Sequence, residues 1–399
     1  MYVGWDWATE SHAVTVLDEV GAVIARWTLR HDEAGIAGAI RQLARLGSAA
    51  QLPVAIETTS GLVVERLLEA GHPVVPVHPN ALHVSRPRWG AAGAKSDPGD
   101  SYRLADYLRT DGHRLRRLRP LDAATAQLQA LVRRRDDHVE ARISATNQLT
   151  ALLAAHWPGA AALFARLDSD IALDFLERYP TPGHAARLGE QRLGAFLRRH
   201  GYSGRRSAEE LLGRLRAAPT PAGGLDPDVL SDCVRAQVTL VRSLLRTISG
   251  LERAIAGVLP GHPMAGVLGP LPRIGEVNLA QVLAEVGPII ERAASPEQAA
   301  AEIGAAPVTK ASGKGRAVVF RWAANARARD ALGIFADNSR HASPWAAGLY
   351  RGARARGKRH PGAIRIVMRA WTRVIWACWH TGTPYDPAHH GGEIRLAAG

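Results

Sequence analysis

The sequence predicts an α/β domain at the N-terminus, an arm of long helices in the middle, and a basic, mainly α-helical domain at the C-terminus. Short apolar runs typical of strands alternate with helical patterns over the first 110 residues, and long stretches with apolar residues at helical spacing follow. Shorter helical patterns separated by Gly and Pro complete the chain, which at 399 residues is longer than one compact core usually needs. We therefore expect domains over 1–115, 116–258 and 259–399.

The N-terminal domain begins with three strand-like runs in quick succession, close enough to form an antiparallel meander. A helix, a strand, a second helix and another strand are expected next, and a further helix begins at Pro98. This order is that of the ribonuclease-H-like fold. The expected strands cover 2–7, 13–17, 23–29, 54–57 and 74–78, and the expected helices between them cover 33–46 and 62–70.

The middle region predicts an arm of two long helices. Residues 121–157 have apolar side chains at helical spacing and no internal Pro or Gly, and a second long stretch with apolar residues at helical spacing covers 227–258. A smaller helical insert, at about 160–225, lies between them and is punctuated by Gly and Pro. Two long helices joined in this way predict a coiled-coil-like hairpin that can serve as a dimerisation arm.

The composition excludes several other classes of protein. No apolar run approaches the roughly 18 to 20 residues of a membrane-spanning helix, and the N-terminus lacks the basic start and apolar stretch of a signal peptide. Two cysteines, Cys233 and Cys378, cannot build a disulfide framework or a four-thiolate zinc site. These features predict a protein of the reducing cytoplasm with no membrane partner.

Basic charge is concentrated in the C-terminal quarter. The chain has a net charge of +13, and residues 301–399 hold 16 Lys and Arg against five Asp and Glu. Such an excess predicts a polyanionic partner, of which nucleic acid is the usual one, although a basic surface without a specific partner is the alternative. The residues expected to form a phosphate-contacting stripe are Arg351, Arg354, Arg356, Lys358 and Arg359.

Tryptophans in the same quarter have two interpretations. Trp322, Trp345 and three tryptophans further along could stack on nucleic-acid bases. The last three, Trp371, Trp376 and Trp379, have helical spacing, which favours packing in a core.

Four acidic residues stand where a nuclease of the ribonuclease-H-like fold needs them. Asp6 is expected in the middle of the first strand, Glu57 at the end of the fourth, and Asp97 and Asp100 at the start of the next helix, with Asp97 as its N-cap. Because strands one and four approach that helix in this fold, the four carboxylates are expected to converge. Clustered carboxylates repel unless a cation neutralises them, and oxygen-only sites favour Mg²⁺ or Mn²⁺. The pattern therefore predicts a two-metal site for phosphodiester chemistry.

Each acid also has a simpler explanation. Asp97 taken alone is a helix cap and Glu57 an ordinary strand-end acid, so the prediction depends on the joint pattern. Actin-like ATPases and sugar kinases share the fold core, but they need a glycine-rich phosphate turn after the first-strand Asp. Here Asp6 is followed by Trp7-Ala8-Thr9-Glu10, which disfavours a kinase.

Short sequence motifs in both halves of the chain are specific enough to compare with known families. The N-terminal ones are Asp6, Ile56-Glu57-Thr58-Thr59-Ser60-Gly61 and Lys95-Ser96-Asp97-Pro98-Gly99-Asp100. The C-terminal ones are Ile274-Gly275, Gly304-Ala305-Ala306-Pro307-Val308-Thr309, Ser312-Gly313-Lys314, Ser343-Pro344-Trp345 and Gly382-Thr383-Pro384-Tyr385-Asp386. They resemble the DEDD signature and the second domain of the insertion-sequence-110 family of transposases, over roughly 1–110 and 265–387. The segment after Asp6 departs from the family's common Val-Ala-Lys-type run, and the resemblance does not extend to the insert.

The resemblance implies a recombinase that excises and inserts its element, using a structured guide (bridge) RNA that pairs with element DNA and target DNA. A RuvC-like domain would supply the four acids. The second domain would supply a serine that becomes covalently joined to DNA, in an active site completed between protomers of a dimer or tetramer. By motif position this serine is Ser312, and its neighbours Lys310, Lys314 and Arg316 would hold the phosphodiester. Without the resemblance, Ser312 is explained as an ordinary loop serine.

Two alternatives remain open. A Holliday-junction-type, metal-dependent nuclease would use the four acids and ignore Ser312. A nucleic-acid-binding protein of the same fold would lack the chemistry altogether, although the presence of all four acids counts against it.

Overall fold

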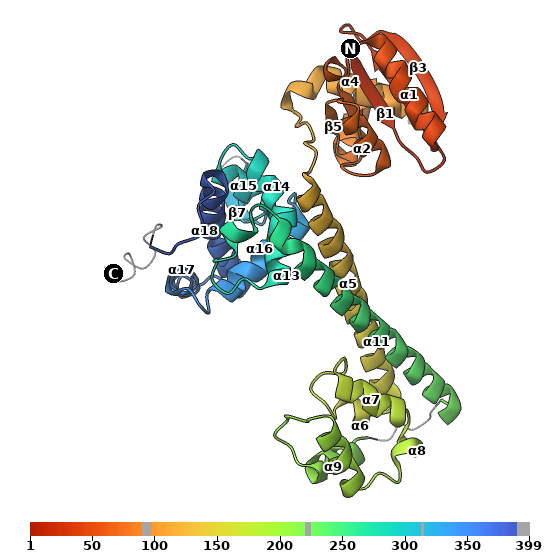
Figure 1. The fold of residues 1–399 in the computed structure, drawn as a ribbon, viewed down its shortest axis with the longest axis vertical. Helices are drawn as coiled ribbons and strands as arrows, with labels where there is room; N and C mark the ends of the chain where they lie inside the picture. The colour runs from red at the N-terminus through yellow and green to blue at the C-terminus, as the bar shows by residue number, and fades with distance from the viewer. Residues whose placement is uncertain (90–96, 220–224, 313–314, 389–399) are drawn as a thin grey trace. The chain divides into compact units, whose positions relative to one another are not determined.

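The computed structural model describes residues 1–89, 97–219, 225–312 and 315–388. The chain forms two compact units, Met1–Leu121 and Asp122–Gly399, each with its own hydrophobic cores (Figure 1). Within the described ranges, no helix is both long and apolar enough to cross a membrane.

The first unit contains a five-stranded mixed sheet. Its strands are β1 (Tyr2–Asp6), β2 (Ser11–Leu17), β3 (Val23–Arg30), β4 (Val54–Ile56) and β5 (Val74–Pro76). The order across the sheet is β3-β2-β1-β4-β5, in which the first three strands are antiparallel neighbours and β4 and β5 run parallel to β1. The predicted meander and the predicted order of strands and helices are confirmed.

Helices cover both faces of this sheet. Val54 and Ile56 of β4 face the core formed with the first two helices, whereas Ala55 between them faces Leu104 and Leu108 of α4. This alternation is expected of a strand that is buried on both faces. The helices are α1 (Glu33–Leu46), α2 (Leu62–Glu69), α3 (Pro79–Ser85) and α4 (Asp97–Asp111), with short 3₁₀ turns at Ala49–Gln51, Arg86–Trp89 and Gly112–Arg114.

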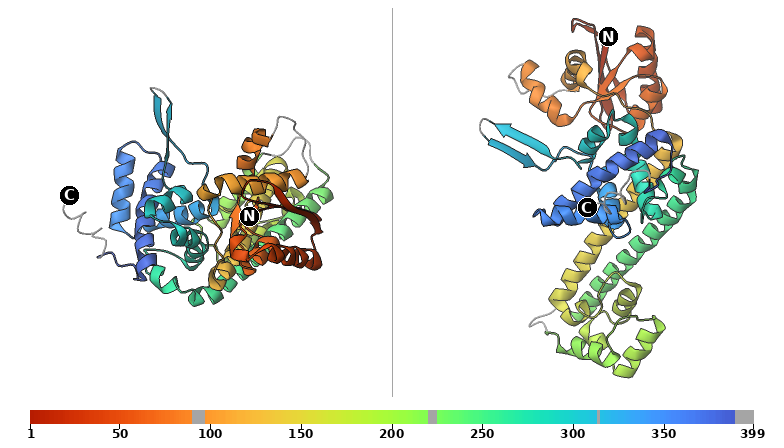
Figure 2. Two further views of the ribbon diagram at one scale, coloured as in Figure 1. Left: turned by 90° about the horizontal axis from the view of Figure 1, so that it is seen from above. Right: turned by 90° about the vertical axis from the view of Figure 1, so that its left-hand side faces the viewer.

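The second unit contains two long helices that lie side by side, α5 (Ala123–His156) and α11 (Pro227–Val258) (Figures 1 and 2). At 1.5 Å per residue, each is about 50 Å long. Leu149 of α5 and Val238 of α11 pack into the core of the insert, whereas Val132 and Ile255 pack into the core of the C-terminal helices. The insert consists of α6 (Pro158–Ala161), α7 (Asp170–Arg178), α8 (Pro182–Ala185), α9 (Glu190–Arg199) and α10 (Ala208–Ala217).

The C-terminal part of this unit is helical apart from one hairpin. The hairpin strands are β6 (Val308–Ser312) and β7 (Gly315–Val319), which pair only with each other. The helices are α12 (Ala265–Leu268), α13 (Glu276–Gln281), α14 (Gly287–Arg292), α15 (Pro296–Ile303), α16 (Ala326–Ser339), α17 (Pro344–Ala355) and α18 (His360–Thr381), with a 3₁₀ turn at Leu259–Gly261 and a π-helix at Val282–Val286.

Trp371 of α18 occupies the centre of the C-terminal core. It is fully buried, its ring contacts those of Phe335, Trp345 and Tyr385, and its Nε1 donates a hydrogen bond of 2.8 Å to Ser339 Oγ. The predicted core role of Trp371 is therefore confirmed. Two further tryptophans of α18 pack against the same core and are partly buried.

A buried ion pair joins the long helix α5 to the π-helix. Glu285 is 4% exposed, and its two carboxylate oxygens accept hydrogen bonds from Arg133 Nε and Nη2 at 2.6 and 3.0 Å. Gln281, one turn earlier, donates to both carboxylate oxygens of Asp136 at 2.9 Å. Buried charges of this kind need well-placed partners, so the pairing fixes how α5 sits on the C-terminal core.

Candidate active site

Asp6 and Glu57 lie at the same edge of the sheet. β1 and β4 are parallel and paired, with Trp5 opposite Ile56, so the next position on each strand is Asp6 and Glu57 respectively. Asp6 is the last residue of β1, so the prediction that it lies in the middle of the strand is wrong. The carboxyl ends of parallel strands are the usual place for ligand sites in α/β sheets, so this correction brings Asp6 level with Glu57.

Helix α4 packs closely against β1 because of Gly4. A Cβ atom at Gly4 would lie 1.9 Å from the backbone oxygen of Ser101 and 2.5 Å from the backbone nitrogen of Ala105, so only glycine fits here. A hydrogen bond of 2.7 Å between Thr15 Oγ1 and Ser101 Oγ joins the same turn of α4 to β2. The first turn of α4, which carries two of the predicted acids, is thereby fixed to the strand that carries Asp6.

The two acids of α4 differ in environment. The helix begins at Asp97, not at Pro98, so the predicted N-cap position of Asp97 is wrong by one residue; Asp97 is exposed. Asp100 is 5% exposed and its Oδ1 accepts a hydrogen bond of 2.7 Å from Arg103 Nη1. Arg86 Nη2 lies 3.4 Å from the same oxygen, and Arg86 Nε is buried with no hydrogen-bond partner among the described residues. Two guanidinium groups therefore offset the cost of burying this carboxylate.

The four acids are the candidate ligands of a metal site. Among the described residues, no three His, Cys, Asp or Glu side chains are grouped so that they can hold a metal ion. The structure brings Asp6 and Glu57 to one sheet edge, and it fixes the helix of Asp97 and Asp100 against β1. The donor set fits Mg²⁺ or Mn²⁺ chemically, because all four side chains are carboxylates. In addition, a divalent cation can replace the guanidinium groups that now neutralise the charge of the buried carboxylate.

Ser312 lies near the tip of the β6–β7 hairpin. It is the last residue of β6, and the backbone pairs it with Gly315, Lys310 with Ala317, and Ala311 with Arg316. Figure 2 shows the hairpin projecting from the C-terminal helices. Lys314 lies outside the described residues. The serine therefore lies at the end of a strand. Without the family resemblance, the sequence indicated an ordinary loop serine instead.

The predicted phosphate-contacting stripe is exposed. Its members lie on the last two turns of α17 and in the segment before α18, and each one is open to solvent: Arg351, Arg354, Arg356, Lys358 and Arg359. Exposed guanidinium and ammonium groups on one short segment suit phosphate contacts, and this role stays a prediction.

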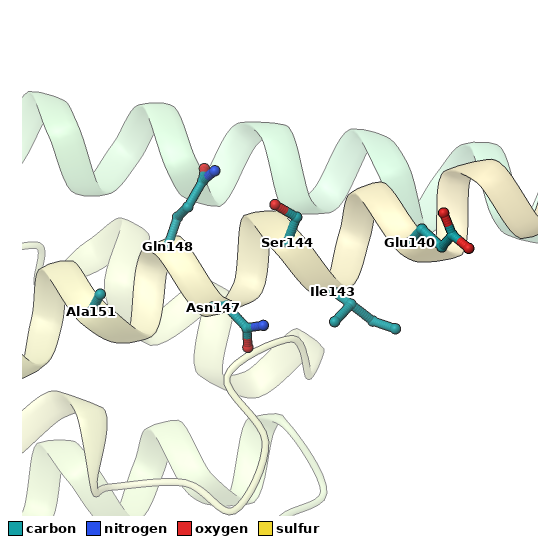
Figure 3. Close-up of a pocket in the computed structure, with 6 residues that line it drawn as sticks. All are labelled: Glu140, Ile143, Ser144, Asn147, Gln148 and Ala151. Carbon is teal, nitrogen blue, oxygen red and sulfur yellow. The ribbon is translucent and has the colours of Figure 1, made fainter.

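Two of the hollows in the second unit differ in how they are lined. The first, of about 550 Å³, is lined by one face of α5 alone. Figure 3 shows Ile143 and Asn147 of this face pointing away from α11. The described residues that line this hollow include no group of catalytic side chains. The second, of about 540 Å³, lies between the hairpin base and α18 and contains several arginines. The sequence did not predict this second cavity. A signal was present, because Arg365, Arg369 and Arg373 recur every four residues and so share a helix face.

Comparison with known proteins decides the family. Residues 3–158 match a family described as Transposase, and residues 265–351 match the Transposase IS116/IS110/IS902 family. The chain is 32% identical over 409 residues to the Mini-circle putative transposase for IS117 of Streptomyces coelicolor, an alignment that covers all of this chain and 98% of that protein. The chain belongs to the IS110 family of transposases. It is also 29% identical to the Insertion element IS110 uncharacterized 43.6 kDa protein of the same organism over 76% of this chain and 75% of that protein, and 25% identical to the Insertion element IS900 uncharacterized 42 kDa protein of Mycobacterium paratuberculosis over 97% and 98%.

The two family matches include both parts of the candidate site of this IS110-family transposase. The four acids lie within 3–158 and Ser312 lies within 265–351. Most of the insert lies between the two matches. The basic segment after residue 351 and all of α18 also lie outside them, so the arginine-rich cavity is not accounted for by the matched family segments alone.

Proposed function

We propose that this IS110-family transposase is an RNA-guided recombinase that cleaves and rejoins DNA strands of an insertion sequence. Its N-terminal unit would be a ribonuclease-H-like (RuvC-like) catalytic domain, α5 and α11 a coiled-coil arm, and the C-terminal helices the domain that carries the nucleophile. The observation that carries this proposal is the position of Asp6 and Glu57 at the carboxyl ends of paired parallel strands, with the first turn of α4 fixed beside them through Gly4.

Asp6, Glu57, Asp97 and Asp100 would hold Mg²⁺ or Mn²⁺ at this edge. When bound, the cation supplies charge neutralisation for phosphodiester cleavage. Arg103 and Arg86 pair with the Asp100 carboxylate and hold it in place at the start of α4.

Ser312 would act as the nucleophile. Attack of its Oγ on phosphorus forms a phosphoserine ester, breaks the bond from phosphorus to one deoxyribose oxygen, and transfers the serine proton to that leaving oxygen. A serine hydroxyl is a weak nucleophile at neutral pH, so it needs nearby positive charge or a base. Lys310, Lys314 and Arg316 would offset the charge that develops on the phosphate oxygens. The ester conserves the energy of the phosphodiester, so the strand can be rejoined to a new partner without ATP.

The partners that follow are the element DNA, the target DNA, a structured guide RNA and further copies of this chain in a dimer or tetramer. The exposed basic stripe on α17 suits the nucleic-acid phosphates. The two long helices would bring protomers together as a dimerisation arm.

The acid site is tested by strand cleavage with labelled DNA in Mg²⁺ or Mn²⁺. Asp6→Asn and Asp100→Asn should each abolish cleavage and leave DNA binding largely intact, because each removes a candidate metal ligand and not a phosphate contact. Glu65→Gln is the matched control, since Glu65 is an exposed acid on α2 of the same unit and its variant should cleave normally. Normal cleavage by Asp6→Asn would rule out the acid site, and absence of cleavage by the wild type would favour a binding protein without chemistry.

A further inference from the structure

The cavity between the hairpin base and α18 is rich in positive charge. It has a volume of about 540 Å³ and is lined by Arg321 after β7, by Lys358 before α18, and by Arg365, Arg369 and Arg373 of α18. The three arginines of α18 are four residues apart, so they project from the same face at intervals of about 6 Å along the helix axis.

Only one of these cations is hydrogen-bonded to a carboxylate among the described residues. Arg373 donates two hydrogen bonds to Glu297 Oε1, at 2.9 and 3.0 Å. Arg369 interacts electrostatically with the same Glu297 carboxylate, and within the same described ranges Arg321 Nε is buried without a hydrogen-bond partner. Gathering cations in a partly enclosed space is unfavourable unless an anion enters it, so the cavity suits a ligand with more than one negative charge.

Aromatic rings stand beside these cations. The guanidinium of Arg365 lies 4.9 Å from the ring centroid of Phe320, which lines the cavity, and that of Arg329 lies 5.4 Å from the same centroid. The ring of Trp322 is edge-on to Phe320 at 4.9 Å and is 84% exposed. Phe320 therefore orders one of the cavity's guanidinium groups, and Trp322 offers a large π-surface next to the cavity.

We infer that this cavity binds unpaired nucleotides of a polynucleotide strand, with phosphates at Arg321, Arg365 and Arg369 and a base stacked on Trp322. Arginines that follow a backbone, combined with aromatic rings that accept base faces, are the combination that binds single strands. A duplex keeps its base faces stacked inside the helix and cannot offer one to Trp322. The inference rests on the proposed function for the source of the strand, and it requires binding alone, not cleavage.

Binding by the full-length chain is measured in EDTA, so that no cleavage occurs. The probes are a short single-stranded DNA, an RNA of the same sequence and the corresponding DNA duplex, each with 2-aminopurine as a reporter of stacking. The Arg365→Gln, Arg369→Gln double variant should bind a single strand at least tenfold more weakly, because each lost charge-assisted contact is worth roughly a factor of ten. The slope of log K against log salt should become shallower by about 1.4, which is about 0.7 for each phosphate contact.

Trp322→Ala should remove the 2-aminopurine quenching and weaken single-strand binding by roughly 5- to 100-fold. Because Trp322 is exposed, this variant is expected to fold, and circular dichroism checks it. Arg246→Gln is the matched control, since it removes one exposed arginine from α11 and should leave binding unchanged.

Loss of binding to the RNA, the DNA strand or both supports the inference and identifies the strand. Wild-type affinity and quenching in both cavity variants would overturn it, as would an equal loss for the duplex. This measurement involves no cleavage, so failure of the nucleophile and failure of this cavity are distinguishable.

Discussion

Gly4→Ala tests the contact on which the acid site depends. The added Cβ would lie 1.9 Å from the Ser101 oxygen, whereas real Cβ contacts are not shorter than 3.0 Å, so the first turns of α4 must move by more than 1 Å. The Ser101 oxygen and the Ala105 nitrogen are backbone atoms, which cannot rotate away as a flexible side chain can. Overpacking of this kind costs about 1 to 3 kcal/mol, and we expect the upper end of that range because the helix must shift as a whole.

The same shift should impair cleavage. A displacement of about 1 Å in a catalytic group lowers rates by roughly 100-fold, and the moved turn carries Asp97 and Asp100. Gly38→Ala is the control, because its Cβ would have one neighbour, the flexible end of Arg41, at 3.8 Å in the middle of α1, where Ala is favoured over Gly.

The assay combines urea denaturation, hydrogen exchange of peptides that cover β1 and α4, and single-turnover cleavage. Gly4→Ala should lower the denaturation midpoint, expose both peptides to faster exchange and slow cleavage, whereas Gly38→Ala should do none of these. If the two variants behave alike, α4 does not pack on β1 as described, and the acid site has lost its main structural support.

The remaining predictions concern the second unit, its histidines and its charge. Arg133→Met should lower the free energy of unfolding by about 1 to 2 kcal/mol in urea denaturation, because it removes the guanidinium that pairs with the buried Glu285 carboxylate, while the 38% exposure of the Arg133 side chain keeps the loss below that of a fully buried pair. Adding Glu285→Gln should restore part of the loss, and an unchanged midpoint in the single variant would contradict the pairing. Burial lowers the pKa of His72 and of His262 in the folded chain. As the pH falls, these histidines therefore bind protons in the unfolded chain before they do so in the folded chain. The free energy of unfolding should stay nearly constant at higher pH and fall as the pH drops through 6.5. Urea midpoints measured against pH check this, and a midpoint that stays level below 6.5 would contradict it. If about six to ten phosphates are contacted, affinity for structured RNA should fall by roughly 10³ to 10⁵ between 50 and 200 mM salt in a filter-binding titration, and a flat profile would count against the basic surface as the binding face.

Much of the first unit could be predicted from the sequence because its elements are patterned locally. Buried strands such as Val54–Ile56 show as short apolar runs, and α1 shows as a helical stripe. The hairpin of β6 and β7 was not predicted, because these strands pair only with each other and no buried sheet face imposes an alternating pattern on them. Val318 of β7, for example, is 66% exposed.

The sequence indicated the four candidate acids but not what surrounds them. The strand-end position of Glu57 follows from local pattern, whereas the contact of Gly4 with α4 joins residues about 100 positions apart and has no local signal. The pairing of Arg86 with Asp100 is also tertiary, since Arg86 comes from a separate 3₁₀ turn. The arginine face of α18 had a visible signal in its four-residue spacing, but the nearness of Phe320 depends on the fold.

The central claim is that Ser312 becomes covalently joined to DNA. The most direct measurement is a denaturing gel of the full-length chain incubated with guide RNA, divalent cation and labelled element-end DNA. The wild type should give a protein–DNA adduct, Ser312→Ala should give none, and Ser249→Ala, which changes an exposed serine of α11, should give the wild-type amount. An adduct that persists in Ser312→Ala would place the nucleophile elsewhere, and nicked DNA without an adduct in any variant would make the enzyme a metal-dependent hydrolytic nuclease.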